Sequence, residues 1–312
     1  MNGAQEGASR TETDRADRSL TIAIVTTPYA YLPEAHAYAS YLQRCGHDAQ
    51  AVPTAGDASP ADIAIVFSWR DQWNLRHARA RVVHEYHSLS GGSAAASKDR
   101  LKRLLAPPPA GRIFIDTAMR LRFGFAEEVP TLYRPMGIDA ALFGCAVSTT
   151  MPDYDLLYCG TLHRAGVMPT LEELAKRGFR VLAVGAVPSG ATKIPGVELT
   201  GPLARPDLPQ AFQRARFGLN FTPDVHPFNV QISTKTLEYA AAGLGVVANR
   251  YPWIERFARE TGTSVTWLDT LTTPDSLPTE TILQPSLAHL EWARILDAAK
   301  FEPFIAGLGG SR

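Results

Sequence analysis

The residues whose types and spacing best suit chemistry lie in the segment 226–249 of the 312-residue chain. Ser233 or Thr234 can cap a helix that ends at Gly243. Lys235 then falls in the first turn, where a positive charge opposes the helix dipole. A lysine in that position is explained if an anion binds beside it, and phosphate at a helix N-terminus is the common case. The pattern therefore indicates a phosphate-binding helix start.

An acidic side chain shares a face with this lysine. Glu238 follows Lys235 by three residues, a spacing that places both on one side of a helix. A carboxylate there can reach beyond the phosphates to sugar hydroxyls, as acidic residues do for ribose in dinucleotide-binding folds. The alternative is an ordinary exposed Lys–Glu pair on a capped helix.

Two glycine-containing segments earlier in the second half are further candidates. In the segment 158–164, Gly160 permits a close backbone turn, and three polar side chains follow it: Thr161, His163 and Arg164. Arg164 can neutralise a diphosphate through paired hydrogen bonds, although a surface arginine is the plain alternative. Gly185 ends the strand expected at 179–184 and forms a second turn of this kind.

The first half offers proton-transfer groups instead of a phosphate loop. Glu85 and His87 follow a strand expected at 81–84, and either can take a proton from a hydroxyl. Asp116 follows the strand expected at 112–115 and is the weaker candidate. For each of them the alternative is a hydrogen-bonded polar residue at a strand end.

Several classes of protein are disfavoured. The chain has no HExxH, EF-hand or Asp-x-Asp pattern and no GxGxxG or P-loop motif, so no metal or dinucleotide cofactor is expected. Lys+Arg and Asp+Glu both number 31, and this balance argues against a nucleic-acid partner. The three cysteines are widely spaced and are expected to be free thiols in a cytoplasmic protein. No apolar run approaches the roughly 20 residues of a membrane-spanning helix.

The order of the elements predicts two α/β domains. Short apolar runs alternate with helical or polar stretches, which favours parallel sheets covered on both faces. Strands are expected at 21–26, 62–67, 81–84, 112–115, 155–159, 179–184, 217–221, 245–248 and 264–267. The expected division is a disordered leader 1–18, an acceptor domain 19–147, a donor domain 148–285 and a C-terminal segment 286–312, with a helix at about 287–299, that packs back across the domains. Ligands are then expected at the carboxyl ends of strands, in the cleft between the domains.

One basic segment in the first half suggests a surface role. Residues 98–105 combine four cations with three leucines, and Arg120 and Arg122 follow nearby. Such a stretch is suited to peripheral contact with an anionic membrane, on the inner face of which the protein would then lie. The alternative is a solvated helix face with its leucines in the core.

The second half resembles the donor domain of GT-B glycosyltransferases, in the large group 1 (family four-like) of sugar transferases. The resemblance covers about residues 151–300, and its most specific part is the stretch from Ser233 to Ala248. Segments 158–162, 183–185, 196–201 and 207–209 come in the same order, residues 134–139 resemble the interdomain entry, and residues 290–294 resemble a tryptophan-bearing helix. The resemblance implies two Rossmann-like domains that face each other across a cleft.

The same resemblance implies a function. It implies sugar transfer from a nucleoside-diphosphate sugar to an acceptor hydroxyl without a metal, with Lys235 and Arg164 on the diphosphate and Glu238 on ribose. Relatives carry a second glutamate eight positions before the ribose-binding one, where this chain has Val230 beside Asn229. The usual sugar contact and the stereochemical outcome are therefore open. The acceptor is also open: a glycan, a lipid-linked sugar or a small molecule. The alternatives are a nucleotide-sugar epimerase of the same fold and a non-catalytic nucleotide-sugar binder.

Overall fold

The computed structural model describes residues 19–27, 32–90, 94–125, 128–146, 152–190, 193–280 and 282–309. The chain forms two compact units, which are considered separately below. Unit 1 comprises Met1–Gly137 together with Trp292–Arg312, and unit 2 comprises Ile138–Glu291. The division lies earlier in the chain than the expected boundary between 147 and 148, and residues 147–151 are outside the described part. The expected leader 1–18 is also outside it.

The sheet of unit 1 has six parallel strands in the order β2-β1-β3-β4-β5-β6. Because β1 lies between β2 and β3, the chain reverses its direction of travel across the sheet there, and such a switch point is where α/β sheets bind ligands. The strands are β1 (Thr21–Val25), β2 (Asp48–Val52), β3 (Ile63–Val66), β4 (Arg81–Tyr86), β5 (Gly111–Phe114) and β6 (Thr131–Tyr133). Strands β2 and β6 were not expected from the sequence.

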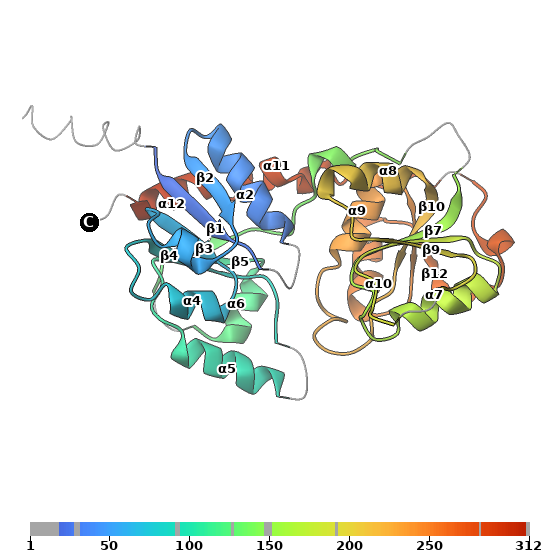
Figure 1. Cartoon of the computed structure of the whole chain (residues 1–312), viewed down its shortest axis with the longest axis horizontal. Helices are drawn as coiled ribbons and strands as arrows, with labels where there is room; N and C mark the ends of the chain where they lie inside the picture. The colour runs from blue at the N-terminus through green and yellow to red at the C-terminus, as the bar shows by residue number, and fades with distance from the viewer. Residues whose placement is uncertain are drawn as a thin grey trace, which may run out of the picture. The chain divides into compact units, whose positions relative to one another are not determined.

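Three helices of unit 1 that follow a strand after a short connection begin at side-chain caps. Thr54, Ser68 and Asp116 accept hydrogen bonds from backbone N–H groups of the first turns of α3, α4 and α6. The helices are α2 (Pro33–Arg44), α3 (Ala55–Ala58), α4 (Trp69–Asn74), α5 (Ala95–Leu105) and α6 (Thr117–Phe123). Figure 1 shows α4, α5 and α6 on the opposite side of the sheet from α2.

The C-terminal helices complete unit 1. One helix over 287–299 was expected, but the structure has a short 3-10 turn η5 (Ala288–Leu290), then α11 (Trp292–Ala298) and α12 (Phe301–Gly309). The expected helix is interrupted because Glu291 forms a bridge with Ile138, whose N–H donates to Leu290 O at 2.8 Å. Helices α11 and α12 pack against α2, where Tyr41 donates to Asp297 at 2.6 Å.

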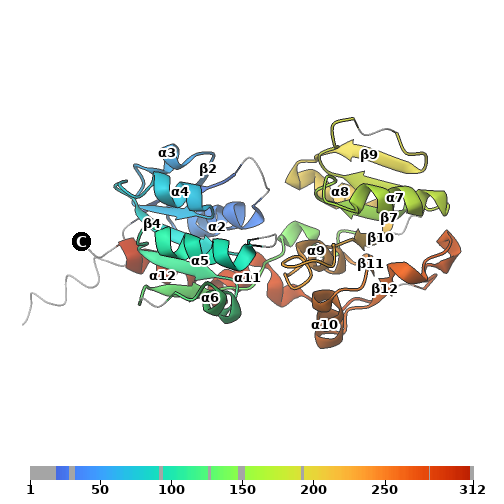
Figure 2. The same ribbon diagram turned by 90° about the horizontal axis from the view of Figure 1, so that it is seen from below.

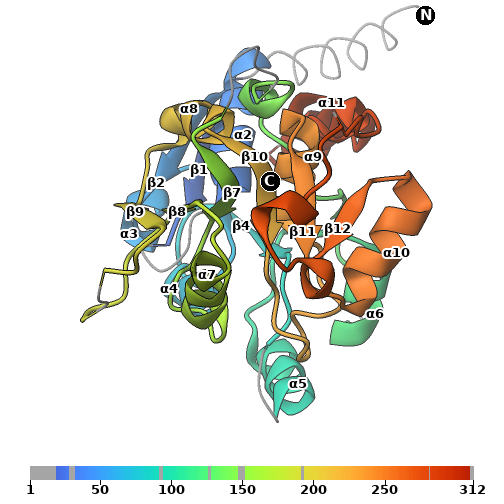
Figure 3. The ribbon, with the colours of Figure 1, turned by 90° about the vertical axis from the view of Figure 1, so that its right-hand side faces the viewer.

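The sheet of unit 2 has six parallel strands in the order β12-β11-β10-β7-β8-β9, with β9 and β12 at its edges (Figure 3). This is the dinucleotide-fold order, and its switch point lies between β7 and β10. The strands are β7 (Tyr154–Cys159), β8 (Val181–Val184), β9 (Val197–Gly201), β10 (Ala215–Asn220), β11 (Gly245–Ala248) and β12 (Val265–Trp267). The α-helices are α7 (Val167–Lys176), α8 (Leu208–Gln213), α9 (Thr234–Ala242) and α10 (Pro252–Thr261). Before η5, the described part of this unit also has the 3-10 turns η1 (Ala140–Leu142), η2 (Arg205–Asp207), η3 (Leu268–Thr270) and η4 (Pro274–Ser276).

Helices cover both faces of the unit 2 sheet. Phe217 of β10 packs in a cluster with Leu171 of α7 on one face. The next residue, Gly218, points to the other face, where an added Cβ would lie 2.1 Å from the ring of Tyr239 in α9. The prediction of two Rossmann-like α/β domains with parallel sheets is therefore confirmed. No helix among the described residues is long and apolar enough to cross a membrane.

The contact between Gly137 and Trp292 gives a test of how the chain end joins unit 1. A Cβ added at Gly137 would lie 2.2 Å from the Trp292 ring, so Gly137→Ala must displace the indole. We expect a loss of about 1–3 kcal/mol in the free energy of unfolding, the usual cost of overpacking, measured by urea denaturation.

The matched control is Gly307→Ala in α12, where an added Cβ meets no atom within 4 Å. Because alanine is the better helix former, this variant should be neutral or more stable by up to about 1 kcal/mol. Equal stability of the two variants would show that the close contact at Gly137 does not hold the chain end.

Candidate functional site: the strand ends of the two sheets

The switch point of unit 2 brings together the segments that were singled out in the sequence. Strands β7 and β10 pair side by side, so their carboxyl ends meet at one edge of the sheet. The loop after β7 carries Gly160 and Arg164, and the segment after β10 leads into α9. These parts are far apart in sequence and become neighbours only through the strand order.

Helix α9 begins at Ser233, which settles the alternative with Thr234. Ser233 has extended backbone angles, and its Oγ accepts from the N–H of Thr236 at 3.4 Å. The same Oγ donates to Oδ1 of Asn220 at 3.1 Å, which ties the helix start to the end of β10. The helix ends at Gly243 in the left-handed region, as predicted.

Lys235 and Arg164 bring two positive charges together beside the start of α9. Lys235 is partly buried, and its Nζ lies 5.7 Å from the centre of the Tyr158 ring. Burial, helped by the charge of Arg164, lowers the pKa of Lys235 to about 8. Arg164 lies over the ring of Phe228 at 5.1 Å. Neither cation forms an ion pair with any residue in the described part of the chain.

Two glycines let the neighbouring loops touch. Gly160 N–H donates to Val184 O at 2.8 Å, and a Cβ added at Gly185 would lie 2.0 Å from Gly160 O. Both glycines also have positive φ angles, 153° and 151°, which side chains disfavour. The contact fixes the start of the loop on which Thr161 and His163 lie, both exposed to solvent.

Glu238 has a partner that the sequence did not indicate. Arg205 donates from Nη2 to Oε1 of Glu238 at 2.7 Å, and its Nε lies 3.3 Å from Asp139 Oδ2. Burial raises the pKa of Glu238, an effect that the charge of Arg205 opposes. The ordinary exposed Lys–Glu pair considered above is therefore not what forms, because Glu238 is buried and pairs with Arg205.

Asn229 lies in the loop between β10 and α9. Its side-chain Nδ2 donates to Asp224 Oδ1 at 3.0 Å, and its backbone carbonyl oxygen accepts from the N–H of Trp253 at 3.1 Å. Its Oδ1 is buried and has no hydrogen-bond partner among the described residues. The loop is thus held to α10 and keeps one acceptor unused.

In unit 1, Glu85 is placed differently from the expectation. Strand β4 extends to Tyr86 instead of ending at His84, so Glu85 lies inside the strand and is buried. Its Oε1 forms an ion pair with the fully buried Arg134, whose Nε donates to Tyr38 OH at 2.5 Å. The Glu85 carboxylate is therefore already engaged by a buried cation.

His87 does follow β4, and it meets a carboxylate from α2. Its Nδ1 lies 3.5 Å from Oε1 of the buried Glu34. His87 also lines a small pocket of about 80 Å³ with Phe67 and Glu85. The arrangement places a histidine with an acidic neighbour near the switch point of the unit 1 sheet. Asp116, the weaker candidate, is occupied as the cap of α6, where it accepts from Met119 N at 2.6 Å.

Glu34, Glu85 and His87 each offer a ligand atom, and these atoms lie within 4.8 Å of one another. The set resembles a metal-binding cluster in composition. However, Glu85 already forms an ion pair with the guanidinium of Arg134, and this positive charge would repel a second cation at the same carboxylate.

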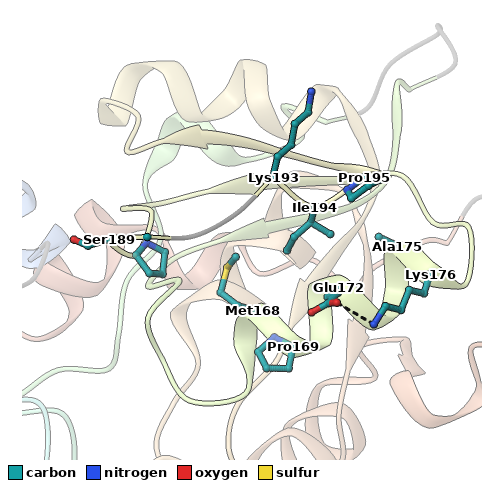
Figure 4. Close-up of a pocket in the computed structure, with 11 residues that line it drawn as sticks. Met168, Pro169, Glu172, Ala175, Lys176, Ser189, Lys193, Ile194 and Pro195 are labelled. Atoms are coloured by element: carbon teal, nitrogen blue, oxygen red, sulfur yellow. Dashed lines mark ion pairs between the residues drawn. The ribbon is translucent and has the colours of Figure 1, made fainter.

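A larger pocket of about 650 Å³ lies elsewhere on unit 2 (Figure 4). It is lined by Met168, Pro169 and Ile194, with Lys193 and the Glu172–Lys176 ion pair around them. None of the predicted donor-binding residues lines it, and it lacks a set of converging polar groups. Volume alone therefore does not identify the functional site here.

The lowered pKa of Lys235 predicts an effect on stability. In the unfolded chain the amine titrates near its ordinary 10.5, so between pH 8 and 10.5 the unfolded state binds more protons and stability rises with pH. Below pH 8 the full cost of burying the charge applies. We expect Lys235→Met to raise Tm at pH 7 and to flatten the rise between pH 8 and 10.5.

Lys176→Met is the control, because Lys176 is exposed and forms only a helix-surface pair with Glu172. Such a solvent-exposed pair contributes little to stability, so Tm should change little. A lower Tm for Lys235→Met than for the wild type would contradict a buried, unpaired charge.

The comparisons with known proteins agree with this architecture. Residues 166–268, about a third of the chain, match the family model for glycosyl transferase-like proteins. No curated protein sequence matches the chain. Among solved structures, AviGT4, a glycosyltransferase involved in avilamycin A biosynthesis, is 15% identical with a TM-score of 0.58, and the match covers 94% of this chain and 99% of AviGT4. SsfS6 from Streptomyces sp. SF2575, a glycosyltransferase solved with thymidine diphosphate, is 14% identical with a TM-score of 0.43. That match covers 93% of this chain and 99% of SsfS6.

The family model lies wholly within unit 2, where the resemblance was strongest, and the match to AviGT4 extends the likeness in fold to both units. The resemblance to GT-B glycosyltransferases predicted from the sequence is thus confirmed: the chain has the GT-B fold and carries a glycosyl transferase-like sequence in its second unit.

Proposed function

We propose that the protein transfers a sugar from a nucleoside-diphosphate sugar to an acceptor hydroxyl. Sugar transfer in general follows from the family match and the fold, and the choice of donor is the step added here. The observation that carries this choice is that the two cations Lys235 and Arg164 lie near each other at the switch point of unit 2. Two cations that repel each other, one of them with its pKa lowered to about 8, are stabilised when a diphosphate binds between them.

The proposed site also fits the charge changes of the reaction. Breaking the sugar–phosphate bond leaves negative charge on the departing nucleoside diphosphate. Fixed dipoles and cations stabilise such charge when they are already in place. The N-terminus of α9, Lys235 and Arg164 would supply this stabilisation without a metal ion, and metal independence is part of the proposal.

Glu238 and Arg205 would bind the sugar of the nucleoside. The Glu238 carboxylate accepts from Arg205 through Oε1 only. Its second oxygen can accept from ribose hydroxyls, while Arg205 and Asp139 hold the group in one orientation. We therefore add Arg205 to the proposed ribose site, as the residue that positions the Glu238 carboxylate.

In unit 1 we propose His87 as the base that takes the proton from the acceptor hydroxyl. Glu34 would orient the imidazole, while Glu85 is already paired with Arg134. The acceptor would be a glycan, a lipid-linked sugar or a small molecule. An epimerase would convert the donor without any acceptor, and a non-catalytic binder would not turn it over at all, so incubation with donor alone and with acceptors separates these classes.

The first test is binding of nucleoside diphosphates, measured by calorimetry with UDP, dTDP, GDP, ADP and CDP. For the diphosphate that binds, Lys235→Met and Arg164→Ala should each lower affinity about ten- to a hundred-fold, the value of a charge-assisted hydrogen bond. Affinity in the wild type should also fall as pH rises above about 8, because the bound form needs a protonated Lys235. In Lys235→Met this dependence should vanish.

Lys176→Met serves as the matched control and should bind like the wild type, since its amine is paired on the surface of α7. EDTA should leave the affinity unchanged. Wild-type affinity in both Lys235→Met and Arg164→Ala would place the donor elsewhere. Loss of binding in EDTA that manganese or magnesium restores would overturn the metal-free proposal.

The second test concerns proton transfer. His87→Ala should slow release of nucleoside diphosphate from the donor by about a hundred-fold or more in the presence of an acceptor. Diphosphate affinity should stay within about twofold, because His87 belongs to unit 1. Glu34→Gln should lower turnover less than His87→Ala does, because it keeps the imidazole and removes only the carboxylate beside it.

The exposed His77 provides the control variant His77→Ala, which should leave turnover unchanged. Near-normal turnover in His87→Ala would exclude His87 as the base.

A further inference from the structure

Helix α5 of unit 1 has its polar and apolar faces reversed relative to an ordinary surface helix. Among the residues of this helix whose burial is described, only the acid Asp99 is buried, and it accepts from the N–H of Ser90 at 3.2 Å. Arg103, on the same side, donates to the carbonyl oxygen of Gly124. The helix is therefore attached to the unit by polar contacts, and its leucines are not needed for the core.

These leucines point outward instead. Leu101, Leu104 and Leu105 have 55%, 65% and 45% of their surface exposed. Their spacing of i, i+3 and i+4 puts them in one stripe, roughly 140–240° around the helix from Asp99. Leu121 of α6, a helix in contact with α5, is 76% exposed. Figure 2 shows α5 at the surface of unit 1. The alternative considered from the sequence, a solvated helix face with its leucines in the core, is thus wrong for this segment.

Cations flank the leucine stripe on both sides. At about 100° per residue, Arg100 lies on one side of it, and Lys98 and Lys102 lie on the other. The described parts of α5 and α6 contain six cations and one acid, and that acid is the buried Asp99. A leucine stripe between rows of cations is the pattern of a helix that lies in the headgroup region of an anionic bilayer.

We propose that α5 docks unit 1 on an anionic membrane surface, with Leu101, Leu104 and Leu105 inserted among the lipids and the flanking cations on the headgroups. Three half-exposed leucines offer far less area than the roughly 800 Å² per partner of a stable protein interface. A two-fold contact with a second copy would also bring the same cations face to face. An anionic bilayer satisfies both the charge and the apolar stripe.

The experiment is sedimentation of the full chain with vesicles of phosphatidylcholine alone or mixed with phosphatidylglycerol, at low and moderate salt. We expect binding to the anionic vesicles only, weakened by salt. Lys98→Ala with Arg100→Ala should reduce it about thirty-fold, at the usual contribution per basic residue. Leu101→Gln with Leu104→Gln should reduce it at least about tenfold.

Matched controls lie on unit 2. Arg256→Ala with Arg259→Ala removes the same charge from the exposed side of α10, and Leu283→Gln alters a leucine that is 88% exposed. Both controls should bind vesicles like the wild type. No binding to anionic vesicles at either salt would overturn the proposal. Binding that the leucine variants leave unchanged would overturn insertion. A dimer in solution that Leu104→Gln dissociates would assign the stripe to a second copy.

Discussion

The parallel direction of every strand in both sheets is the constraint on which the placement of the chemistry depends. Parallel strands are buried on both faces, so their polar chemistry is confined to the strand ends and the loops that follow. The order β9-β8-β7-β10-β11-β12 opens a gap between connections at β7 and β10, and Gly160, Arg164 and α9 lie there. In unit 1 the same rule brings Glu34 of α2 to His87 beyond β4.

The proposed donor site combines a tightly packed backbone with a charge that has no ion-pair partner among the described residues. The contact between Gly160 and Gly185 and the bonds from Ser233 to Asn220 and Thr236 leave the loops little freedom. Into this fixed frame the fold places Lys235, whose pKa of about 8 records the cost of burial. Charge held in place before the ligand arrives needs no reorganisation during the reaction, and this favours rate at the expense of stability.

The sequence was sufficient for features that depend on local chemistry. The cap and end of α9 follow from Ser233 and Gly243. The start of the loop that carries Arg164 follows from Gly160, which comes directly after the apolar run of β7. The fold class followed from the alternation of elements. The boundaries of β4 were less certain, because Glu85 is a charged residue inside a buried strand and is stabilised only by Arg134, far along the chain.

Features that depend on distant pairing could not be derived. Arg205 reaches Glu238 across 33 positions of sequence, and nothing in the local pattern around Arg205 distinguishes it from a surface arginine. Strand β2 alternates polar and apolar residues at a sheet edge, and β6 is only three residues long, so neither gave the apolar run of a central strand. The sequence left two orientations open for the leucines of α5, because periodicity shows that residues share a face but not which way that face points.

The return of α11 and α12 to unit 1 makes that unit discontinuous in sequence, while unit 2 is one unbroken stretch. Tyr38 of α2 packs its ring 4.4 Å from that of Phe301, and Trp292 covers Gly137. During synthesis, unit 2 therefore has all its residues before unit 1 does. Unit 1 cannot be completed until α11 and α12 have left the ribosome, so unit 2 can fold before the unit that it interrupts in sequence.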